Sequence, residues 1–258
     1  MIQERLKALR AEMEKRGITV YVVPTADFHE SEYVGDHFKA RKFITGFTGS
    51  AGTAVITLDE AGLWTDGRYF VQAENQLKDS TVTLYRMGEE GVPTVDEFVK
   101  DRLKEGGCLG FDGRVVNGTW GGRLEKIAAE KNVSMHVTED LIDLIWEDRP
   151  ALSKQPLFIL EEKYSGKSTA DKIGDLRKAM KENGADVHIL TSLYDIAWLL
   201  NIRGNDIDYV PVVLSYLVLN ETECIWFLQE EVVDDKIRAY LEENHILSLI
   251  HISEPTRH

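Results

Sequence analysis

The stretch FITGFTGSAGTAVITLDEAGLWTDGRYFVQ, residues 43–72, decides the fold of the first half of this chain. Its three early glycines are typical of a turn in which the backbone takes a positive φ or lies close against a neighbour. The β-branched run TAVITL and the short run LWT flank an acidic turn, and this pattern predicts a β-hairpin. A helical pattern begins at Tyr69, so Arg68 lies at a strand-to-helix corner.

Arg68 is a candidate binding residue because a long cation can project there from a rigid base. Its guanidinium offers several donors in a planar fork, which suits a carboxylate or a pair of peptide carbonyls. The spacing alone equally favours a solvated surface charge or an ion pair at the helix end. Both interpretations stay open at the level of the residues.

Length and composition indicate a soluble globular protein of two modest domains. The 258 residues are 43% hydrophobic and 29% charged, and the net charge is -14. A charge of this sign argues against nucleic acid or an anionic membrane as a partner. The first sixteen residues form a charged amphipathic helix rather than a signal peptide. Cys108 and Cys224 stand far apart, so we expect no disulfide or zinc site and a reducing, cytoplasmic compartment.

The chain contains an internal repeat. The first helix has apolar residues at helical spacing and ends at Gly17, and a buried strand follows. Leu9, Met13 and Gly17 recur at constant offset as Leu176, Met180 and Gly184. The runs FITGFTG and WLLNIRG are parallel in the same way, as are the two hairpins. We therefore predict two copies of one α/β unit.

In the first copy, alternating strands and helices continue to about residue 147, and helices should cover both faces of a mixed sheet. The stretch 148–156 has prolines near both ends and is the predicted linker. The second copy, 157–246, has strands expected at Val212–Leu219 and Glu223–Leu228 and a helix at Asp234–Glu243. It is then incomplete by comparison with the first.

Residues 247–258, LSLIHISEPTRH, differ abruptly from the rest. They resemble the translation of a sequencing-library adapter, so we interpret them as a non-native tail without functional weight. The alternative is a natural strand, Leu247–Ile252, followed by a polar end.

Several motifs together resemble the N-terminal part of Xaa-Pro aminopeptidases, the aminopeptidase P family of creatinase-fold metallopeptidases. These motifs are PTADFHESEY, WTDGRYF, WEDRP and AWLLNIRGNDI, and the resemblance extends to residue 246. It implies two tandem homologous α/β domains of the creatinase N-terminal type, each a mixed sheet flanked by helices, the second incomplete. It also implies that Arg68, the arginine of WTDGRYF, contacts the peptide substrate.

The resemblance implies further properties of the whole enzyme. The family adds a catalytic domain of pita-bread fold, where two aspartates, a histidine and two glutamates bind two divalent metal ions, usually manganese. The substrates are peptides with proline in second position, and the enzymes are commonly homodimers. None of those five ligands lies in this chain, so we expect no catalytic residue, no bound metal and no peptidase activity here.

Other candidate residues are less clear. Arg203, at the glycine turn of the second copy, is a second candidate for substrate contact, and an ion pair with Asp206 or Asp208 is its alternative. Asp206 and Asp208 have the D-x-D spacing of a metal pair but lack a histidine or glutamate partner set. His29 begins an HExxH-like run, yet Tyr33 stands where the second histidine belongs.

A different function class also stays open. Histone-chaperone subunits reuse this fold without metals, so a non-catalytic peptide- or histone-binding module is the alternative to an aminopeptidase. Creatinase, a related enzyme, is less similar in the WTDGRYF and NIRGND runs.

Overall fold

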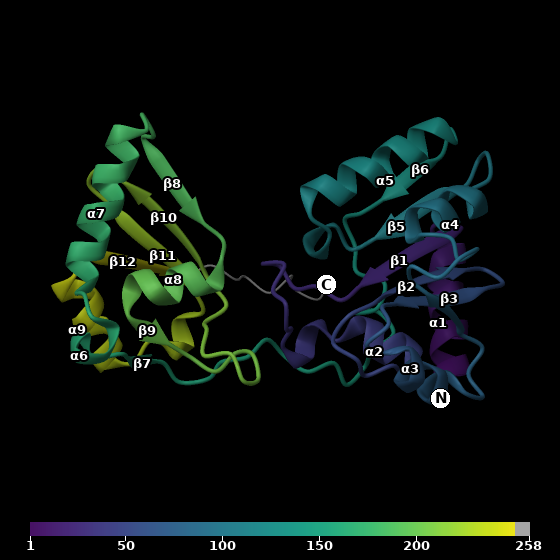
Figure 1. Cartoon of the computed structure of the whole chain (residues 1–258), viewed down its shortest axis with the longest axis horizontal. Helices are drawn as coiled ribbons and strands as arrows, with labels where there is room; N and C mark the ends of the chain where they lie inside the picture. The colour runs from purple at the N-terminus through teal and green to yellow at the C-terminus, as the bar shows by residue number, and fades with distance from the viewer. Residues whose placement is uncertain (251–258) are drawn as a thin grey trace. The chain divides into compact units, whose positions relative to one another are not determined.

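The computed structural model describes residues 1–250 and divides into two compact units, Met1–Ala151 and a second unit that begins at Leu152. The division falls inside the stretch 148–156. Residues 251–258, most of the tail that we interpret as adapter-like, lie outside the described residues. Each unit has its own sheet and its own apolar core (Figure 1).

The first unit contains five helices and six strands, besides short 3-10 turns. They are α1 (Ile2–Lys15), β1 (Val20–Pro24), α2 (Ala40–Thr45), β2 (Thr53–Thr57), β3 (Ala61–Thr65), α3 (Phe70–Leu77), β4 (Thr83–Arg86), α4 (Val95–Arg102), β5 (Cys108–Phe111), α5 (Gly118–Glu130) and β6 (Ser134–His136). The strand order is β4-β3-β2-β1-β5-β6, in which β2 is antiparallel to β1 and β3 while the other pairs are parallel. The hairpin β2–β3 and the mixed sheet are as the sequence predicts.

Helices cover both faces of this sheet. One core, beneath α1, α2 and α3, includes Leu9 and Ile44, and the other, beneath α4 and α5, includes Val22 and Trp64. Trp64 is completely buried, stacks on Tyr85 with ring centroids 4.1 Å apart, and donates from Nε1 to the Pro93 carbonyl. The hydrogen bond satisfies the polar end of a ring that is otherwise in an apolar environment.

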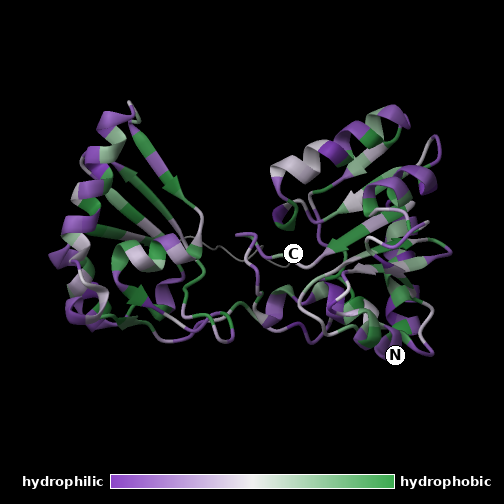
Figure 2. Cartoon of the chain, in the orientation of Figure 1, coloured by the Kyte–Doolittle hydropathy of each residue, from purple (hydrophilic) through white to green (hydrophobic). Residues whose placement is uncertain are grey.

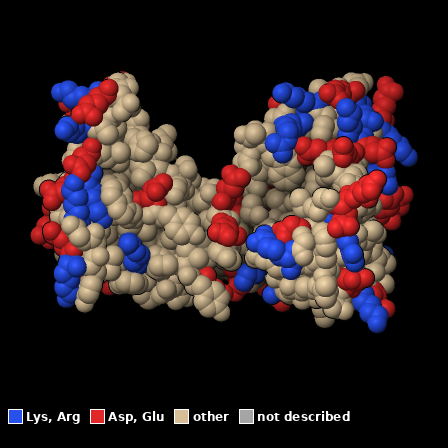
Figure 3. Space-filling model, in the orientation of Figure 1, with Lys and Arg blue, Asp and Glu red and all other residues tan. Residues whose placement is uncertain are grey.

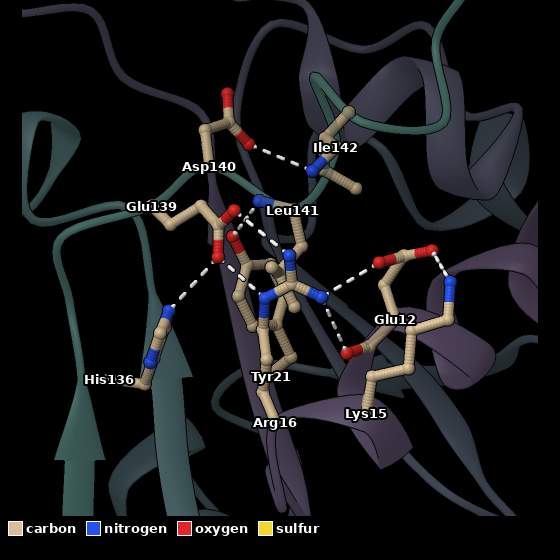
Figure 4. A network of polar contacts seen from close by, with 9 residues as sticks. All are labelled: Glu12, Lys15, Arg16, Tyr21, His136, Glu139, Asp140, Leu141 and Ile142. Atoms are coloured by element: carbon tan, nitrogen blue, oxygen red, sulfur yellow. Dashed lines mark hydrogen bonds and ion pairs between the residues drawn. The ribbon is translucent and has the colours of Figure 1, made fainter. Parts of the chain in front are cut away.

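A polar network ties α1 to the end of the first unit (Figure 4). Arg16 bridges two carboxylates: Nη1 lies 2.7 Å from Glu12, and Nε and Nη2 lie 2.5 and 2.9 Å from Glu139. These hydrogen bonds hold the pKa of Glu139 below its usual value. The buried Tyr21 hydroxyl accepts from the Leu141 N–H at 3.0 Å, so the segment after β6 is fixed to the central strand.

The second unit repeats the order of elements. It contains β7 (Phe158–Ile159), α6 (Glu162–Ser165), α7 (Thr169–Glu182), β8 (Val187–Leu190), α8 (Leu193–Leu200), β9 (Ile202–Arg203), β10 (Tyr216–Asn220), β11 (Cys224–Leu228), α9 (Asp235–Glu243) and β12 (Ile246–Ile250). Its main sheet has the order β12-β11-β10-β8 and is also mixed, with only β11 and β12 parallel. The helix α7 begins as expected, since the Ser168 hydroxyl accepts from the Asp171 N–H.

The repeat extends to individual side chains. Arg5 donates to the Phe43 carbonyl at 2.7 Å and lies over that ring, and Lys172 does the same with Trp198 at the corresponding positions. Arg10 and Arg177 each donate to the carbonyl of the last residue in the strand that precedes the hairpin turn, Thr57 and Asn220. Such matched contacts confirm two homologous units of one α/β design.

Two expectations about the second unit need correction or comment. The strand expected at Val212–Leu219 starts only at Tyr216, because the Leu214 N–H donates to Asp206 and the preceding Pro211 has no N–H for a ladder. Residues 247–250 of the expected tail belong to strand β12, which pairs with β11. Their interpretation as adapter-like sequence stays a prediction.

Candidate functional site

The strand-to-helix corner after β3 positions Arg68 at the surface of the first unit. Its side chain is 68% exposed, and Nε and Nη2 lie 2.8 and 2.9 Å from the two carboxylate oxygens of Asp66. This two-point contact lowers the pKa of Asp66 to about 2. Nη1 has no hydrogen-bond partner among residues 1–250, so part of the guanidinium fork is open to solvent.

Asp66 also lines a surface cavity of about 370 Å³, next to which Arg68 projects. The cavity lies at the ends of β1 and β3 and at the start of α5, where Pro24, Thr65 and Asn117 contribute to its wall. The lining carries hydroxyl, carboxylate and aromatic groups: Thr25, Glu30, Ser31, Glu32, Ser50, Thr53, Asp66 and Trp120. Glu32 also acts electrostatically on Arg68. A ligand there would meet acceptors from the wall and a cation from the corner.

The last residues of the glycine turn, 50–53, line this cavity, and the turn's conformation depends on its glycines. Gly46 has φ of 78°, and a side chain at Gly49 would place Cβ 2.3 Å from the Phe47 ring, so both positions require glycine. The Ser50 hydroxyl and the Tyr69 hydroxyl lie 2.6 Å apart and join the turn to the start of α3. This explains why the turn and the corner stay together although eighteen residues separate Ser50 and Tyr69.

Arg41 is a residue of this region that the sequence did not single out. It is 4% exposed, lies over the Phe47 ring, and donates to the Phe47 and Gly49 carbonyls and to the Thr25 hydroxyl. Burial lowers its pKa to about 10. The sequence feature that could have indicated the buried position of Arg41 is the presence of a cation in the short apolar helix before the glycine turn.

Arg203 lies elsewhere, in the second unit, and its surroundings differ from those of Arg68. It donates from Nη1 to the carbonyls of Ala197 and Ile202, the latter at 3.0 Å, and burial lowers its pKa. Within the described chain it forms no ion pair with Asp206 or Asp208, so that alternative is wrong. Main-chain carbonyls hold Arg203 at the junction of α8 and β9, and a role in substrate binding stays a prediction.

The two aspartates of the D-x-D run do not converge. Asp206 is 6% exposed and accepts from the Leu214 N–H at 2.8 Å, whereas Asp208 is exposed. Burial raises the pKa of Asp206. The residues from 1 to 250 include no group of three or more His, Cys, Asp or Glu side chains placed to bind a metal ion, and His29 belongs to no such group. They therefore do not fit a two-metal centre.

The sequence and the fold have known counterparts. Residues 5–145 and 148–255 each match the creatinase/prolidase N-terminal domain family. The chain belongs to this family. No helix in the described part of the chain is long and apolar enough to cross a membrane.

Proteins similar in sequence to this chain include aminopeptidases. A probable Xaa-Pro aminopeptidase P of Sordaria macrospora is 42% identical over 244 residues, covering 93% of this chain and 40% of the relative. Aminopeptidase P1 of Lotus japonicus is 40% identical over 248 residues, covering 95% of this chain and 37% of the relative. The chain thus spans about two fifths of the length of these relatives.

A solved structure has the same fold over nearly the whole chain. The crystal structure of X-prolyl aminopeptidase from Caenorhabditis elegans superposes with a TM-score of 0.91 and 33% identity, covering 97% of this chain and 42% of that one. That protein is described as a cytosolic enzyme with a dinuclear active site.

Proposed function

We propose that this chain is the N-terminal, non-catalytic part of a metal-dependent Xaa-Pro aminopeptidase, which removes the residue that precedes a proline in second position. The observation that carries the proposal is the exposed guanidinium of Arg68 beside a cavity of about 370 Å³, in a chain similar to aminopeptidases across both units. The open donors of Arg68 suit a peptide carbonyl or carboxylate.

In this proposal the chain binds and orients peptide and does not hydrolyse it. Two divalent metal ions, which we expect to be manganese, would supply an activated water elsewhere in the whole enzyme. Residues 1–250 include no group of His, Cys, Asp or Glu side chains placed to bind such ions, and this supports our proposal that the hydrolytic step belongs to the rest of the whole enzyme. We further propose a cytosolic location and a homodimeric whole enzyme, the former because the Caenorhabditis elegans neighbour is described as cytosolic.

The test compares this chain with a chimera in which residues 1–246 replace the matched two fifths of the Sordaria macrospora relative. With manganese and the tripeptide Ala-Pro-Ala, we expect the chimera to release alanine and the chain alone to release none. Alanine release by the chain alone would contradict the non-catalytic assignment. A folded, metal-loaded chimera without activity would contradict the aminopeptidase assignment and favour a peptide-binding module.

A further inference from the structure

Arg41 of α2 is a buried cation without a carboxylate beside it. Its side chain is 4% exposed, and it forms no ion pair with any carboxylate among residues 1–250. Figure 3 shows lysine, arginine, aspartate and glutamate side chains over the surface of the first unit in this view, where water can hydrate them. Burying a guanidinium among neutral groups costs free energy, so its presence here points to a role beyond packing.

The hydrogen bonds of Arg41 support two segments of the cavity wall. The guanidinium donates from Nε to the Thr25 hydroxyl at 2.9 Å, from Nη1 to the Phe47 carbonyl at 2.8 Å, and from Nη2 to the Gly49 carbonyl. Thr25 in turn donates from its hydroxyl and from its N–H to the Gly52 carbonyl, at 2.7 and 3.1 Å. Thr25 and Gly52 both line the cavity of about 370 Å³, whereas Arg41 does not. Arg41 therefore acts on the wall from behind it.

A guanidinium is the cation that fits these acceptors. The three oxygens belong to the end of β1 and to the glycine turn, and Figure 2 shows β1 as mostly hydrophobic, so Arg41 meets this strand at its polar end. The planar fork of a guanidinium has five donors, whereas an ammonium has one nitrogen and cannot reach three separated acceptors in the same way. We therefore expect lysine to be a poor replacement.

A second set of contacts links Arg41 to the corner that bears Arg68. The guanidinium carbon of Arg41 lies 4.7 Å from the centroid of the Phe47 ring. That ring meets the Tyr69 ring edge to face, with centroids 5.9 Å apart, and the Tyr69 hydroxyl lies 2.6 Å from the Ser50 hydroxyl. Tyr69 follows Arg68 directly, and the Arg68 guanidinium carbon lies 5.3 Å from the centroid of its ring. Contacts thus run from Arg41 both to the wall and to the corner.

The second unit shows that the fold itself does not require a cation at this position. The parallel runs FITGFTG and WLLNIRG place Ile196 where the first unit has Arg41. Ile196 is 2% exposed and packs in the apolar core of its unit. There Arg203 donates to the carbonyl of Ile202, which is the counterpart of the Phe47 carbonyl. Of the two units, the one that holds the cavity is therefore the one with a buried arginine in this helix.

We infer that Arg41 is a positioning residue of the peptide site, which fixes residues 50–53 of the cavity wall and the corner from which Arg68 projects. This inference rests on the proposed function, because a positioned site acts only if a peptide binds there. Arg41 touches no substrate itself and is not a catalytic residue. Its replacement should weaken the contact between Arg68 and peptide although Arg68 is still present.

The first measurement is hydrogen exchange in the chain alone. Arg41→Lys keeps the charge but loses the three-point contact, so the bond from the Thr25 N–H to the Gly52 carbonyl should open more often. The Thr25 amide proton should exchange at least about tenfold faster than in wild type, while the amide protons of β5 keep their rates. Exchange that is unchanged, or that is faster by the same factor in β5, overturns the inference.

Arg5→Lys is the matched control for this measurement. Arg5 also lies over an aromatic ring and donates to a main-chain carbonyl, in both cases of Phe43, and neither residue lines the cavity. Its replacement should leave the exchange rate of the Thr25 amide unchanged. A Thr25 amide that responds equally to Arg5→Lys and Arg41→Lys contradicts a specific role of Arg41.

The second measurement uses the chimera and separates positioning from stability. Arg41→Lys should lower kcat/KM for Ala-Pro-Ala by about tenfold, mainly through a higher KM, because the affected contact is one of binding. In an Arg68→Ala background the same substitution should lower kcat/KM by less than about threefold, since the contact that Arg41 positions is already absent. The same factor in both backgrounds indicates a purely structural role and overturns the inference.

Thr25→Val keeps the test decisive if Arg41→Lys does not fold. It removes only the hydroxyl between Arg41 and the Gly52 carbonyl. It should also raise KM, and most of this effect should disappear in the Arg68→Ala background. An unchanged KM overturns the inference. A chimera without activity contradicts the proposed function alone, because exchange in the chain then still decides whether Arg41 positions the wall.

Discussion

The geometry of Arg68 is compatible with two roles, a structural ion pair and a contact with substrate. Loss of the first would lower stability, and loss of the second would lower activity. In the described chain Arg68 pairs with the partly exposed Asp66 and lies over the Tyr69 ring, with the guanidinium carbon 5.3 Å from the ring centroid. Exposed ion pairs of this kind contribute at most about 1 kcal/mol to the free energy of unfolding. A structural role would therefore be small, whereas a contact with substrate would appear directly in catalysis.

In the chimera, Arg68→Ala should lower kcat/KM for an Xaa-Pro peptide by roughly ten- to a hundredfold, since a charge-assisted contact is worth about 1.5–3 kcal/mol. Arg68→Lys should restore only part, because an ammonium cannot form a planar two-point contact. Metal content and Tm should not change. Arg86→Ala is the matched control, because Arg86 forms a similar exposed pair with Glu74 at 3.2 Å. An unchanged kcat/KM in Arg68→Ala would rule out the substrate contact.

His37 provides a pH-dependent contribution to the first unit. Its Nδ1 lies 2.8 Å from the Pro150 carbonyl. Burial and the nearby Arg149 lower its pKa from 6.5, an effect that the hydrogen bond to Pro150 and the nearby Asp143 and Asp140 partly offset. A base with a lowered pKa in the folded state stabilises the fold above pH 6.5 and loses this contribution as the pH falls through the folded pKa. The neutral ring is thus the form that the fold prefers.

We therefore expect the His37 resonances to titrate below pH 6.5 in NMR spectra of the chain. The stability advantage of wild type over His37→Gln should shrink as the pH is lowered from about 7 to 5, because glutamine carries no titrating group. Thermal unfolding of both proteins at each pH measures this. A His37 pKa at or above the ordinary value would be inconsistent with the burial argument.

At the scale of elements, the two units form the same contact between a cation and an aromatic ring with different side chains. In each unit a cation from a long helix lies over an aromatic ring of the next helix. Arg5 of α1 lies over Phe43 of α2, and Lys172 of α7 lies over Trp198 of α8. Lys172 is 2% exposed and donates at 2.7 Å to both the Trp198 carbonyl and Asn201 Oδ1. Burial and the nearby cations Arg203 and Lys167 lower its pKa.

Lys172→Arg should be tolerated, because Arg5 makes the equivalent contact in the first unit. Lys172→Met should destabilise the second unit by about 1–3 kcal/mol, since it removes the donor to the buried Asn201 amide oxygen and to the partly buried Trp198 carbonyl. Denaturant unfolding of the whole chain, followed by the fluorescence of its five tryptophans, of which Trp198 and Trp226 lie in the second unit, measures the difference. A Met variant as stable as wild type would mean that the cost of burying the charge equals the gain from its hydrogen bonds.

At the scale of the whole molecule, the two units should differ in their independence. The sheet of the first unit has helices on both faces, whereas the described sheet of the second has them on one. Burial of apolar surface is the main favourable contribution to folding. The second unit leaves one sheet face hydrated, so it gains less stability from such burial.

We predict that residues 1–151 fold alone and that the second unit does not. Limited proteolysis of the chain should leave a resistant fragment that ends near Ala151, while cleavage sites accumulate after Leu152. The fragment 1–151, expressed separately, should unfold cooperatively. Equal resistance of both units would contradict the difference in coverage.

The sequence by itself determined the local architecture and the repeat. The glycine turn, the hairpin β2–β3 and the corner at Arg68 follow from turn chemistry and side-chain periodicity, which act over a few residues. The recurrence of Leu9, Met13 and Gly17 as Leu176, Met180 and Gly184 required only a comparison of the chain with itself. Such features are encoded by neighbours along the chain.

Only the tertiary structure decided what each polar or apolar side chain meets. Arg203 binds main-chain carbonyls rather than Asp206, Arg41 is buried against the glycine turn, and β10 starts late because Asp206 takes the Leu214 N–H. Val187 and Ile189 of β8 are apolar like their buried counterparts Val20 and Val22 in β1, so their exposure cannot be read from the pattern. The physical reason is that burial and hydrogen-bond partners depend on segments distant in sequence, whereas propensity and periodicity depend on adjacent residues.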